Sequence, residues 1–161
     1  MAVRQIRIAL IEDSPTVRMF YRKLFETAGF EVLEAENAKD GWSIICNQRP
    51  DVIVLDMMMP EIPGIELLKR IRSYEYLKNI PVLVLTSIKE PDKVKEIYQH
   101  GADHYTLKGM DSPDMVKQTV YQLLKKEQEE QVQRKLEGQD NKEVEIPEID
   151  RHFFWFESDL E

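Results

Sequence analysis

Polar side chains suited to a reaction centre follow four short segments rich in β-branched, aliphatic or aromatic residues. In open parallel α/β sheets, the carboxyl ends of the strands border the crevice in which ligands bind. If the four segments are strands of one sheet, the polar side chains that follow them lie at the same edge. They comprise three carboxylates, one hydroxyl and one amine, from Glu12, Asp13, Asp56, Thr86 and Lys108.

Three carboxylates in one crevice repel one another and require a cation, and their hard oxygen atoms suit Mg²⁺. With the repulsion relieved, one carboxylate can attack an electrophilic phosphorus and form an aspartyl phosphate. Asp56 directly follows the aliphatic segment 52–55 and is therefore placed where chemistry is usually done in such sheets, although an aspartate at a strand end is more often a turn residue. Lys108 and Thr86 would then offer an ammonium and a hydroxyl group to the charged phosphoryl oxygens.

Five strand segments alternate with helical segments in the first 126 residues. Residues 52–55 are wholly aliphatic, as is typical of a strand buried on both faces of a parallel sheet. The alternation predicts an α/β, doubly wound, five-stranded parallel sheet of order 2-1-3-4-5 with helices on both faces. The expected strands cover residues 6–11, 31–35, 51–55, 81–85 and 103–107.

Capping residues mark the expected helix starts, among them a Ser-Pro pair at 14–15, Asn37 and Gly64. The last helix starts near Ser112. Strong helix formers follow it, so the helix is expected to continue to Gly138, a length of about 26 residues.

Residues 1–126 resemble the receiver domain of two-component response regulators, which has this flavodoxin-like fold. The resemblance is carried in order by Glu12-Asp13, Asp56-Met57-Met58-Met59-Pro60 with Gly64, Thr86-Ser87, Tyr105 and Lys108. It implies a phosphoprotein of signal transduction or a phosphorelay. Asp56 would accept a phosphoryl group from a sensor histidine kinase or phosphotransfer protein. Such a domain is a signalling module rather than an enzyme, and only phosphotransfer to itself and autodephosphorylation are expected.

The resemblance also implies a magnesium site and a switch. The Mg²⁺ ligands would be oxygen atoms near the ends of the first and third strands: Asp13, Asp56, the backbone carbonyl of Met58 and, directly or through water, Glu12. Thr86 would move toward the phosphoryl group, and Tyr105 would turn inward to fill the vacated space. These movements would remodel the interaction surface formed by the fourth helix, the fifth strand and the fifth helix.

Three features depart from the family pattern. Glu12 stands where Asp is commoner, which adds one methylene to a metal-site acid. Gly109 stands where the family usually has a cis-linked proline, so a trans bond after Lys108 is expected, since a non-proline cis bond costs about 3 kcal/mol. Met58 and Ile88 are apolar and cannot orient a hydrolytic water, so a long-lived aspartyl phosphate is expected.

Other interpretations exist for these residues. Taken alone, Glu12 and Asp13 suit a helix start and Thr86 suits a strand end. A Mg²⁺-dependent phosphatase of the haloacid dehalogenase type would have a second aspartate two residues after its nucleophile, where this chain has Met58. A pseudo-receiver that binds partners without phosphorylation is disfavoured by the complete set of site residues.

Composition limits the function further. The 161 residues carry a net charge of -8, and residues 127–161 account for it, with 4 basic and 12 acidic side chains against 18 of each before them. A neutral body with an acidic tail argues against direct nucleic-acid binding. Apolar runs are too short for a membrane span, a secretory signal is lacking, and the single cysteine, Cys46, fits a reducing compartment, so a cytoplasmic location is expected.

The sequence predicts two parts, a receiver at 1–126 and an acidic helical extension with an aromatic tail at 127–161. The helical extension has only Val132 and Leu136 on one apolar stripe, so it is either a solvated arm or a homodimer seam. Residues 153–156 are four aromatics in a row, which favours docking on a receiver surface of the same or a neighbouring chain. Alternatively, the chain is a fragment of a longer protein.

Overall fold

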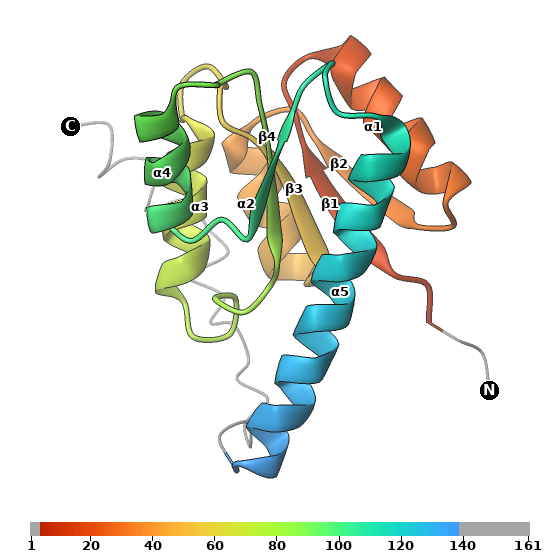
Figure 1. Cartoon of the computed structure of the whole chain (residues 1–161), viewed down its shortest axis with the longest axis vertical. Helices are drawn as coiled ribbons and strands as arrows, with labels where there is room; N and C mark the ends of the chain where they lie inside the picture. The colour runs from red at the N-terminus through yellow and green to blue at the C-terminus, as the bar shows by residue number, and fades with distance from the viewer. Residues whose placement is uncertain (1–3, 139–161) are drawn as a thin grey trace.

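Five parallel strands form the centre of the molecule in the computed structural model, which describes residues 4–138 (Figure 1). The order β2-β1-β3-β4-β5 confirms the predicted topology. The strands are β1 (Arg7–Ile11), β2 (Glu31–Ala35), β3 (Val52–Asp56), β4 (Val82–Thr86) and β5 (His104–Leu107). Because β1 and β3 are neighbours, the chain changes direction along the sheet between them, which is where such folds bind ligands.

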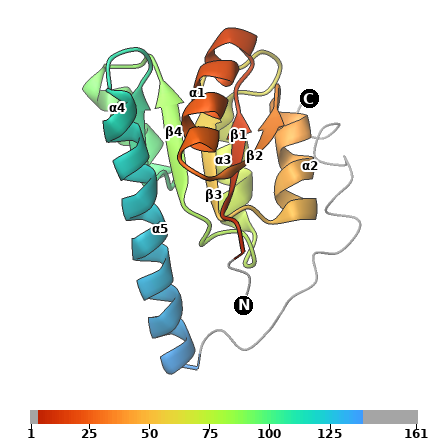
Figure 2. The same cartoon turned by 90° about the vertical axis from the view of Figure 1, so that its right-hand side faces the viewer.

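Helices cover both faces of the sheet (Figures 1 and 2). One face packs against α1 and α5, and the other packs against α2, α3 and α4. The bounds are α1 (Pro15–Thr27), α2 (Ala38–Gln48), α3 (Gly64–Ser73), α4 (Pro91–Gln99) and α5 (Pro113–Leu136). This arrangement confirms the doubly wound fold expected from the alternation of segments.

The central strands are buried along their whole length, because helices lie on both sides of them. Successive side chains of a strand point to opposite faces. Accordingly, Ile53 and Leu55 of β3 join the core beneath α2 and α3, whereas Val52 and Val54 join the core beneath α1 and α5. The aliphatic run recognised in the sequence thus anchors two cores at once and holds the end of β3 in a fixed position.

Local capping fixes the helix starts as the sequence predicts. The Ser14 hydroxyl accepts a hydrogen bond from the Val17 N–H at the start of α1, and the Asn37 side chain accepts one from the Asp40 N–H at the start of α2. The ends of β3 and β4 lie one residue later than predicted, whereas the other three strands end as predicted. Asp56 is the last residue of β3 rather than the residue after it, so its backbone is held in the strand ladder.

The last helix, α5, extends well past the sheet, as predicted (Figure 1). Its first half is buried through Val116, Val120 and Leu123, whereas Val132 and Leu136 in the second half are 58% and 77% exposed. The choice between a solvated arm and a homodimer seam therefore stays open. The expected docking of the aromatic run 153–156 lies outside the described residues.

Arg72 of α3 joins several segments at the edge of the sheet opposite to the strand ends. Its guanidinium donates to the carbonyls of Gly101 (2.8 Å), Lys78 (2.9 Å) and Ile80 (2.7 Å), and it forms an ion pair with Asp103 (2.8 Å). The Arg72 side chain is mostly buried, with 18% exposed. A planar group with several fixed donors is suited to bridging loops in this way.

We expect Arg72→Met to lower the free energy of unfolding by about 3 kcal/mol, because carbonyls and a carboxylate lose a charged donor. Thermal unfolding should show a midpoint about 10 °C lower. Lys69→Met on the same helix removes only an exposed pair with Glu66 and should change stability by less than about 0.5 kcal/mol. Equal effects of the two substitutions would contradict the role given to Arg72.

Candidate functional site

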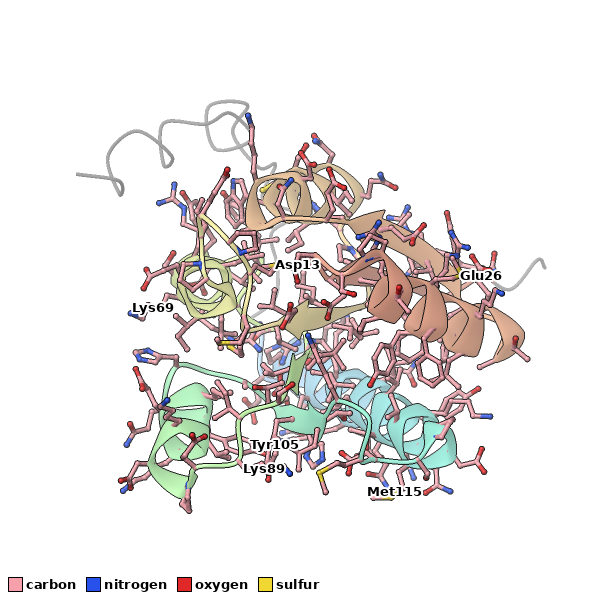
Figure 3. All side chains as sticks on the ribbon, turned by 90° about the horizontal axis from the view of Figure 1, so that it is seen from above. Asp13, Glu26, Lys69, Lys89, Tyr105 and Met115 are labelled. Carbon is pink, nitrogen blue, oxygen red and sulfur yellow. The ribbon has the colours of Figure 1, made fainter. Side chains whose placement is uncertain are left out.

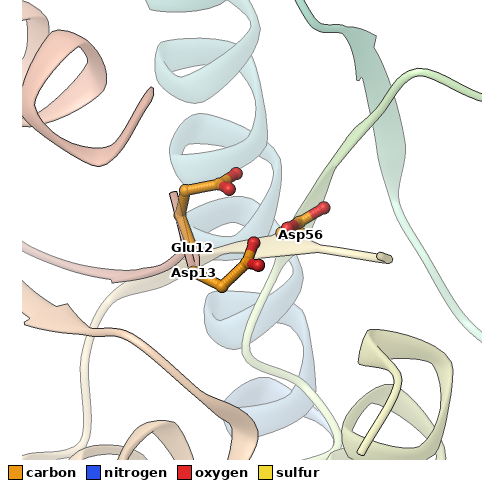
Figure 4. A group of neighbouring side chains, drawn as sticks. All are labelled: Glu12, Asp13 and Asp56. Carbon is orange, nitrogen blue, oxygen red and sulfur yellow. The ribbon is translucent and has the colours of Figure 1, made fainter. Parts of the chain in front are cut away.

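The three predicted acids meet at the carboxyl edge of the sheet (Figure 4). β1 and β3 run side by side with Ile11 opposite Leu55, so the residues that follow, Glu12 and Asp56, emerge next to each other. Asp13 comes from the turn between β1 and α1. One carboxylate oxygen from each of the three residues lies within 4.8 Å of the other two. The structure therefore brings together side chains that lie more than forty positions apart in the sequence.

Asp56 is fully buried, and its two oxygens differ in their contacts. The Oδ1 atom lies 2.8 Å from the Lys108 Nζ and accepts a hydrogen bond of 3.0 Å from the Met58 N–H. The Oδ2 atom is buried and accepts no hydrogen bond from any residue of 4–138. A buried polar atom without a donor is uncommon in folded proteins and is a candidate for contact with a bound ligand.

Gly64 allows the loop after β3 to fold tightly against Asp56. A Cβ atom at this position would lie 2.0 Å from the Asp56 carbonyl oxygen, closer than any two such atoms can approach. The Gly64 N–H donates to the Met57 carbonyl at 3.1 Å and closes the loop. The glycine noted in the sequence is thus a steric requirement of the site.

Lys108 connects the acids across the sheet edge. Its Nζ lies 2.8 Å from both the Asp56 Oδ1 and the Glu12 Oε2, and its backbone N–H donates to the Thr86 carbonyl. All peptide bonds in residues 4–138 are trans, as expected after Lys108, and Gly109 has a positive φ of 73°. Glycine tolerates this conformation, so the turn aims the lysine side chain inward without a proline.

Burial and pairing shift the pKa values of these groups in different directions. Desolvation raises the pKa of Asp56 to about 7, and the hydrogen bond from Lys108 only partly offsets it. Burial opposes the charge of Lys108, but hydrogen bonds to Asp56 and Glu12 outweigh it and raise the Lys108 pKa. Desolvation acts to raise the pKa of Asp13 as well, yet its hydrogen bonds with Asp56 and Glu12 lower it. In the absence of a cation, burial therefore favours the protonated form of Asp56 below about pH 7.

The other predicted site residues lie around this group of acids. The Thr86 hydroxyl is buried at the end of β4 and accepts a hydrogen bond from the Ile88 N–H at 2.9 Å. Tyr105 on β5 is half-buried, and its ring packs edge-on against Tyr98 of α4 at 5.9 Å. Figure 3 shows Asp13 near the middle of this edge and Tyr105 on the side of α4 and α5. Met58 is exposed, although its N–H contacts Asp56.

The residues fit a hard divalent cation. Three clustered carboxylates offer oxygen ligands, and one of them holds a buried oxygen without a hydrogen-bond donor in residues 4–138. Mg²⁺ binds through one or two carboxylates and retains several waters, so this edge provides enough protein ligands. Among residues 4–138, the Lys108 ammonium contacts two of the acids.

The sequence analysis gave no role to Arg18, which contacts the backbone of the site, or to Glu34, which pairs with Arg18. The Arg18 Nη1 donates to the Glu12 carbonyl at 2.8 Å, and its Nε lies 3.5 Å from the Glu34 Oε1. A signal was present in the sequence, because a basic residue near a helix start opposes the helix dipole and calls for an acidic partner. The position of that partner at the end of β2 depends on the fold.

A five-stranded doubly wound sheet with clustered acids and a lysine at its carboxyl edge defines a class of phosphoryl-binding signalling domains, and the family comparison agrees. The model of the response regulator receiver domain matches residues 8–120. The chain therefore belongs to the response regulator receiver family. Receiver domains are signalling modules that interact with histidine kinases or phosphotransfer proteins, and the family typically binds Mg²⁺ at an acidic pocket.

Individual relatives agree with this assignment. The chain is 35% identical over 109 residues to the phosphate regulon transcriptional regulatory protein PhoB of Pseudomonas aeruginosa, covering 68% of this chain and 48% of that protein. It is 33% identical over 112 residues to protein PilH of the same organism, covering 69% of this chain and 92% of that protein. The chain thus spans about half the length or less of several curated relatives and nearly the whole of others.

Solved structures show the same fold. The receiver domain of a Francisella response regulator superposes with a TM-score of 0.70 at 30% identity, over 76% of this chain and 98% of that chain. The chemotaxis protein CheY4 of Vibrio cholerae gives a TM-score of 0.70 at 27% identity, over 74% of this chain and 99% of that chain. Among the helices of residues 4–138, none combines the length and hydrophobicity that a membrane span requires.

We expect Asp56→Asn to stabilise the protein at high pH when divalent cations are absent. The pKa of Asp56 is raised in the folded state to about 7, whereas an aspartate in an unfolded chain titrates near 3.9. The folded state therefore binds more protons, and this group's contribution to stability is lost as the pH rises from about 4 through about 7. Thermal unfolding at about pH 8 should give the variant a midpoint about 5 °C above wild type.

This gain should disappear near pH 5, where wild-type Asp56 is protonated, and Mg²⁺ should reduce it at pH 8. The exposed Asp92→Asn serves as a control that removes a carboxylate without relieving a buried one. If the unfolding midpoint of Asp56→Asn equals that of wild type at each pH in this range, then burial does not destabilise the ionised Asp56 carboxylate.

Proposed function

We propose that this chain accepts a phosphoryl group on Asp56 from a sensor histidine kinase or a phosphotransfer protein. The phosphoryl group then changes the surface that the receiver offers to its output partner. The observation that carries the proposal is the environment of the buried Asp56 carboxylate. One of its oxygens accepts no hydrogen bond from residues 4–138, and Lys108 and two further acids lie around it. Family membership supports the same activity.

In the proposed reaction, an Asp56 oxygen attacks the phosphorus of the donor and forms an acyl phosphate bond. The bond between phosphorus and the donor's leaving atom breaks, and its electron pair leaves with the donor. The site therefore needs an ionised Asp56, and the raised pKa of this residue means that nearby positive charge promotes the reaction. Lys108 supplies such charge through its direct contact with Asp56.

Glu12, Asp13 and Asp56, with the backbone carbonyl of Met58, are the residues proposed to hold Mg²⁺. When bound, the ion neutralises the carboxylates and offsets the charge of the phosphoryl oxygens. Glu12 is longer than aspartate and already contacts Lys108, so its carboxylate is proposed to act directly or through a water. Lys108 can pass from the acids to a phosphoryl oxygen with little movement, because its Nζ lies at the edge where the group would be attached.

The proposed switch uses Thr86 and Tyr105. The Thr86 hydroxyl, which accepts from the Ile88 N–H, would reorient to donate to a phosphoryl oxygen. Tyr105 would then leave its contact with Tyr98 and fill the space beside β4. The altered surface would lie on α4, β5 and α5. We propose residues 1–126 as the switching unit and residues 127–161 as an extension outside it.

We expect acetyl phosphate with Mg²⁺ to phosphorylate the wild-type chain, and Asp56→Asn to remain unmodified. Intact mass measurement and a phosphate-affinity gel would detect the modification. Lys108→Met should slow it by about 100-fold, because a charged donor at the reacting centre is lost. The exposed Asp92→Asn is the matched control and should react as wild type does. Modification of Asp56→Asn at the wild-type rate would refute the assignment of Asp56 as the phosphoryl acceptor. Size-exclusion chromatography of wild type and Asp56→Asn would report the oligomeric state of each.

We also expect a long-lived phosphoryl group, because the two side chains that flank the site, Met58 and Ile88, cannot orient a water. Introducing polar groups with Met58→Asn and Ile88→Glu should speed dephosphorylation roughly tenfold or more. The rate is measured by loss of the phosphorylated species after removal of the donor. Met115→Asn, at an exposed methionine of α5, should leave the rate unchanged. An unchanged rate in the double variant would rule out this explanation of the lifetime.

A further inference from the structure

Strand β2 contributes no acid, hydroxyl or lysine to the group around Asp56, yet its end contacts the backbone of the site. The Glu12 N–H donates to the Ala35 carbonyl of β2 at 3.0 Å. On the other side, the Glu12 carbonyl accepts from Arg18, which is paired with Glu34 of β2. We propose that Arg18 is a positioning residue that fixes the Glu12–Asp13 turn for cation binding, and that Glu34 holds Arg18 in place. The inference rests on the proposed magnesium-dependent function.

The position of Arg18 follows from helix geometry. Helical side chains tilt toward the N-terminus of their helix, so the long side chain of Arg18, the fourth residue of α1, reaches back over the helix start. Arg18 is anchored there by its own N–H, which donates to the Ser14 carbonyl at 2.9 Å. Its guanidinium then lies 2.8 Å from the Glu12 carbonyl oxygen, and only 18% of the side chain is exposed.

The contact acts on both metal-site acids of the turn at once. The Glu12 carbonyl belongs to the rigid peptide plane that joins the Glu12 and Asp13 Cα atoms. The Glu12 N–H lies in the preceding peptide plane and is held by Ala35, whereas the carbonyl is held by Arg18, so the peptide planes on both sides of the Glu12 Cα are fixed. The directions in which the two carboxylates leave the backbone are therefore fixed before a cation arrives. Such support of ligands by outer contacts commonly changes metal affinity by 10- to 100-fold.

Glu34 compensates the positive charge that Arg18 brings close to the proposed cation site. A guanidinium near a cation site, and near the positive end of a helix dipole, repels the ion that the acids attract. The Glu34 carboxylate lies 3.5 Å from the Arg18 Nε and compensates the charge, while the Nη1 stays on the carbonyl. An arginine has the fixed, separate donors that two such acceptors require, and a lysine has a single ammonium.

Arg22 provides a matched comparison within the same helix. Its Nη1 lies 3.2 Å from the Glu34 Oε2, so it shares the acidic partner of Arg18. Among residues 4–138, Arg22 pairs with Glu34 and with Glu26, one turn further along α1, and it does not bond to the Glu12 carbonyl. Loss of Arg22 thus removes the same charge and a pair with the same acid, without releasing the Glu12–Asp13 turn.

The test is a calorimetric titration of the full chain with MgCl₂, in wild type and in Arg18→Met, Arg18→Lys and Arg22→Met. Thermal unfolding without Mg²⁺ is recorded for each variant. We expect Arg18→Met to weaken Mg²⁺ binding about 10-fold. Arg18→Lys should lie between Arg18→Met and wild type, since it retains one donor. Arg22→Met should bind within about twofold of wild type, because the turn is unaffected.

A purely structural role for Arg18 predicts a lower unfolding midpoint with unchanged Mg²⁺ affinity in the folded protein, and that result would overturn the inference. Equal weakening by Arg18→Met and Arg22→Met would also overturn it, because the effect would then come from charge alone. If Arg18→Met does not fold, Arg18→Lys decides: weaker binding than wild type supports the inference, and equal binding refutes it. Failure of wild type itself to bind Mg²⁺ would instead remove the proposed function, and this inference with it.

Discussion

The mutual repulsion of three carboxylates at one sheet edge is the constraint that organises this molecule. Glu12, Asp13 and Asp56 lie close together because the strands that carry them, β1 and β3, are neighbours in a buried sheet. Lys108 contacts two of the acids and is the ammonium that reduces this repulsion. The pKa of Asp56 nevertheless rises to about 7, since burial disfavours its charge. The fold therefore holds a carboxylate that gains stability from any added positive charge, which is a useful property in a site that binds a cation and a phosphoryl group.

Holding the acids together requires a rigid frame, and the two cores provide it. The aliphatic residues of β3 and β4 pack on both faces, so the ends of these strands cannot withdraw from each other to relieve the repulsion. Arg72 joins the loops at the opposite edge of the sheet, and β2 holds the backbone of the acidic turn through Ala35 and Glu34. Each peripheral element thus contributes to the fixed geometry of the site even where it supplies no reactive group.

The two halves of the extended α5 helix differ in burial. Its first half closes the core over the sheet through Val116 and Val120, and its second half leaves the body and exposes Val132 and Leu136. The α5 helix begins directly after the loop that carries Lys108, so a change at the phosphoryl site has a short path to it along the chain. The chain belongs to the receiver family, whose members are signalling modules that interact with histidine kinases or phosphotransfer proteins.

The sequence alone predicted the strand segments to within one residue at each end, the helix starts at Ser14 and Asn37, the strand order, and the three acids that the fold brings together. These features depend on local patterns: aliphatic runs, capping residues, and the handedness rule for strand connections. Only the tertiary structure decided that Lys108 bridges Asp56 and Glu12, that Asp56 is the last residue of its strand, and that Arg18 and Glu34 brace the turn. The reason is physical: the direction of a long charged side chain is set by partners distant in sequence, and the burial that shifts a pKa exists only after the elements have packed.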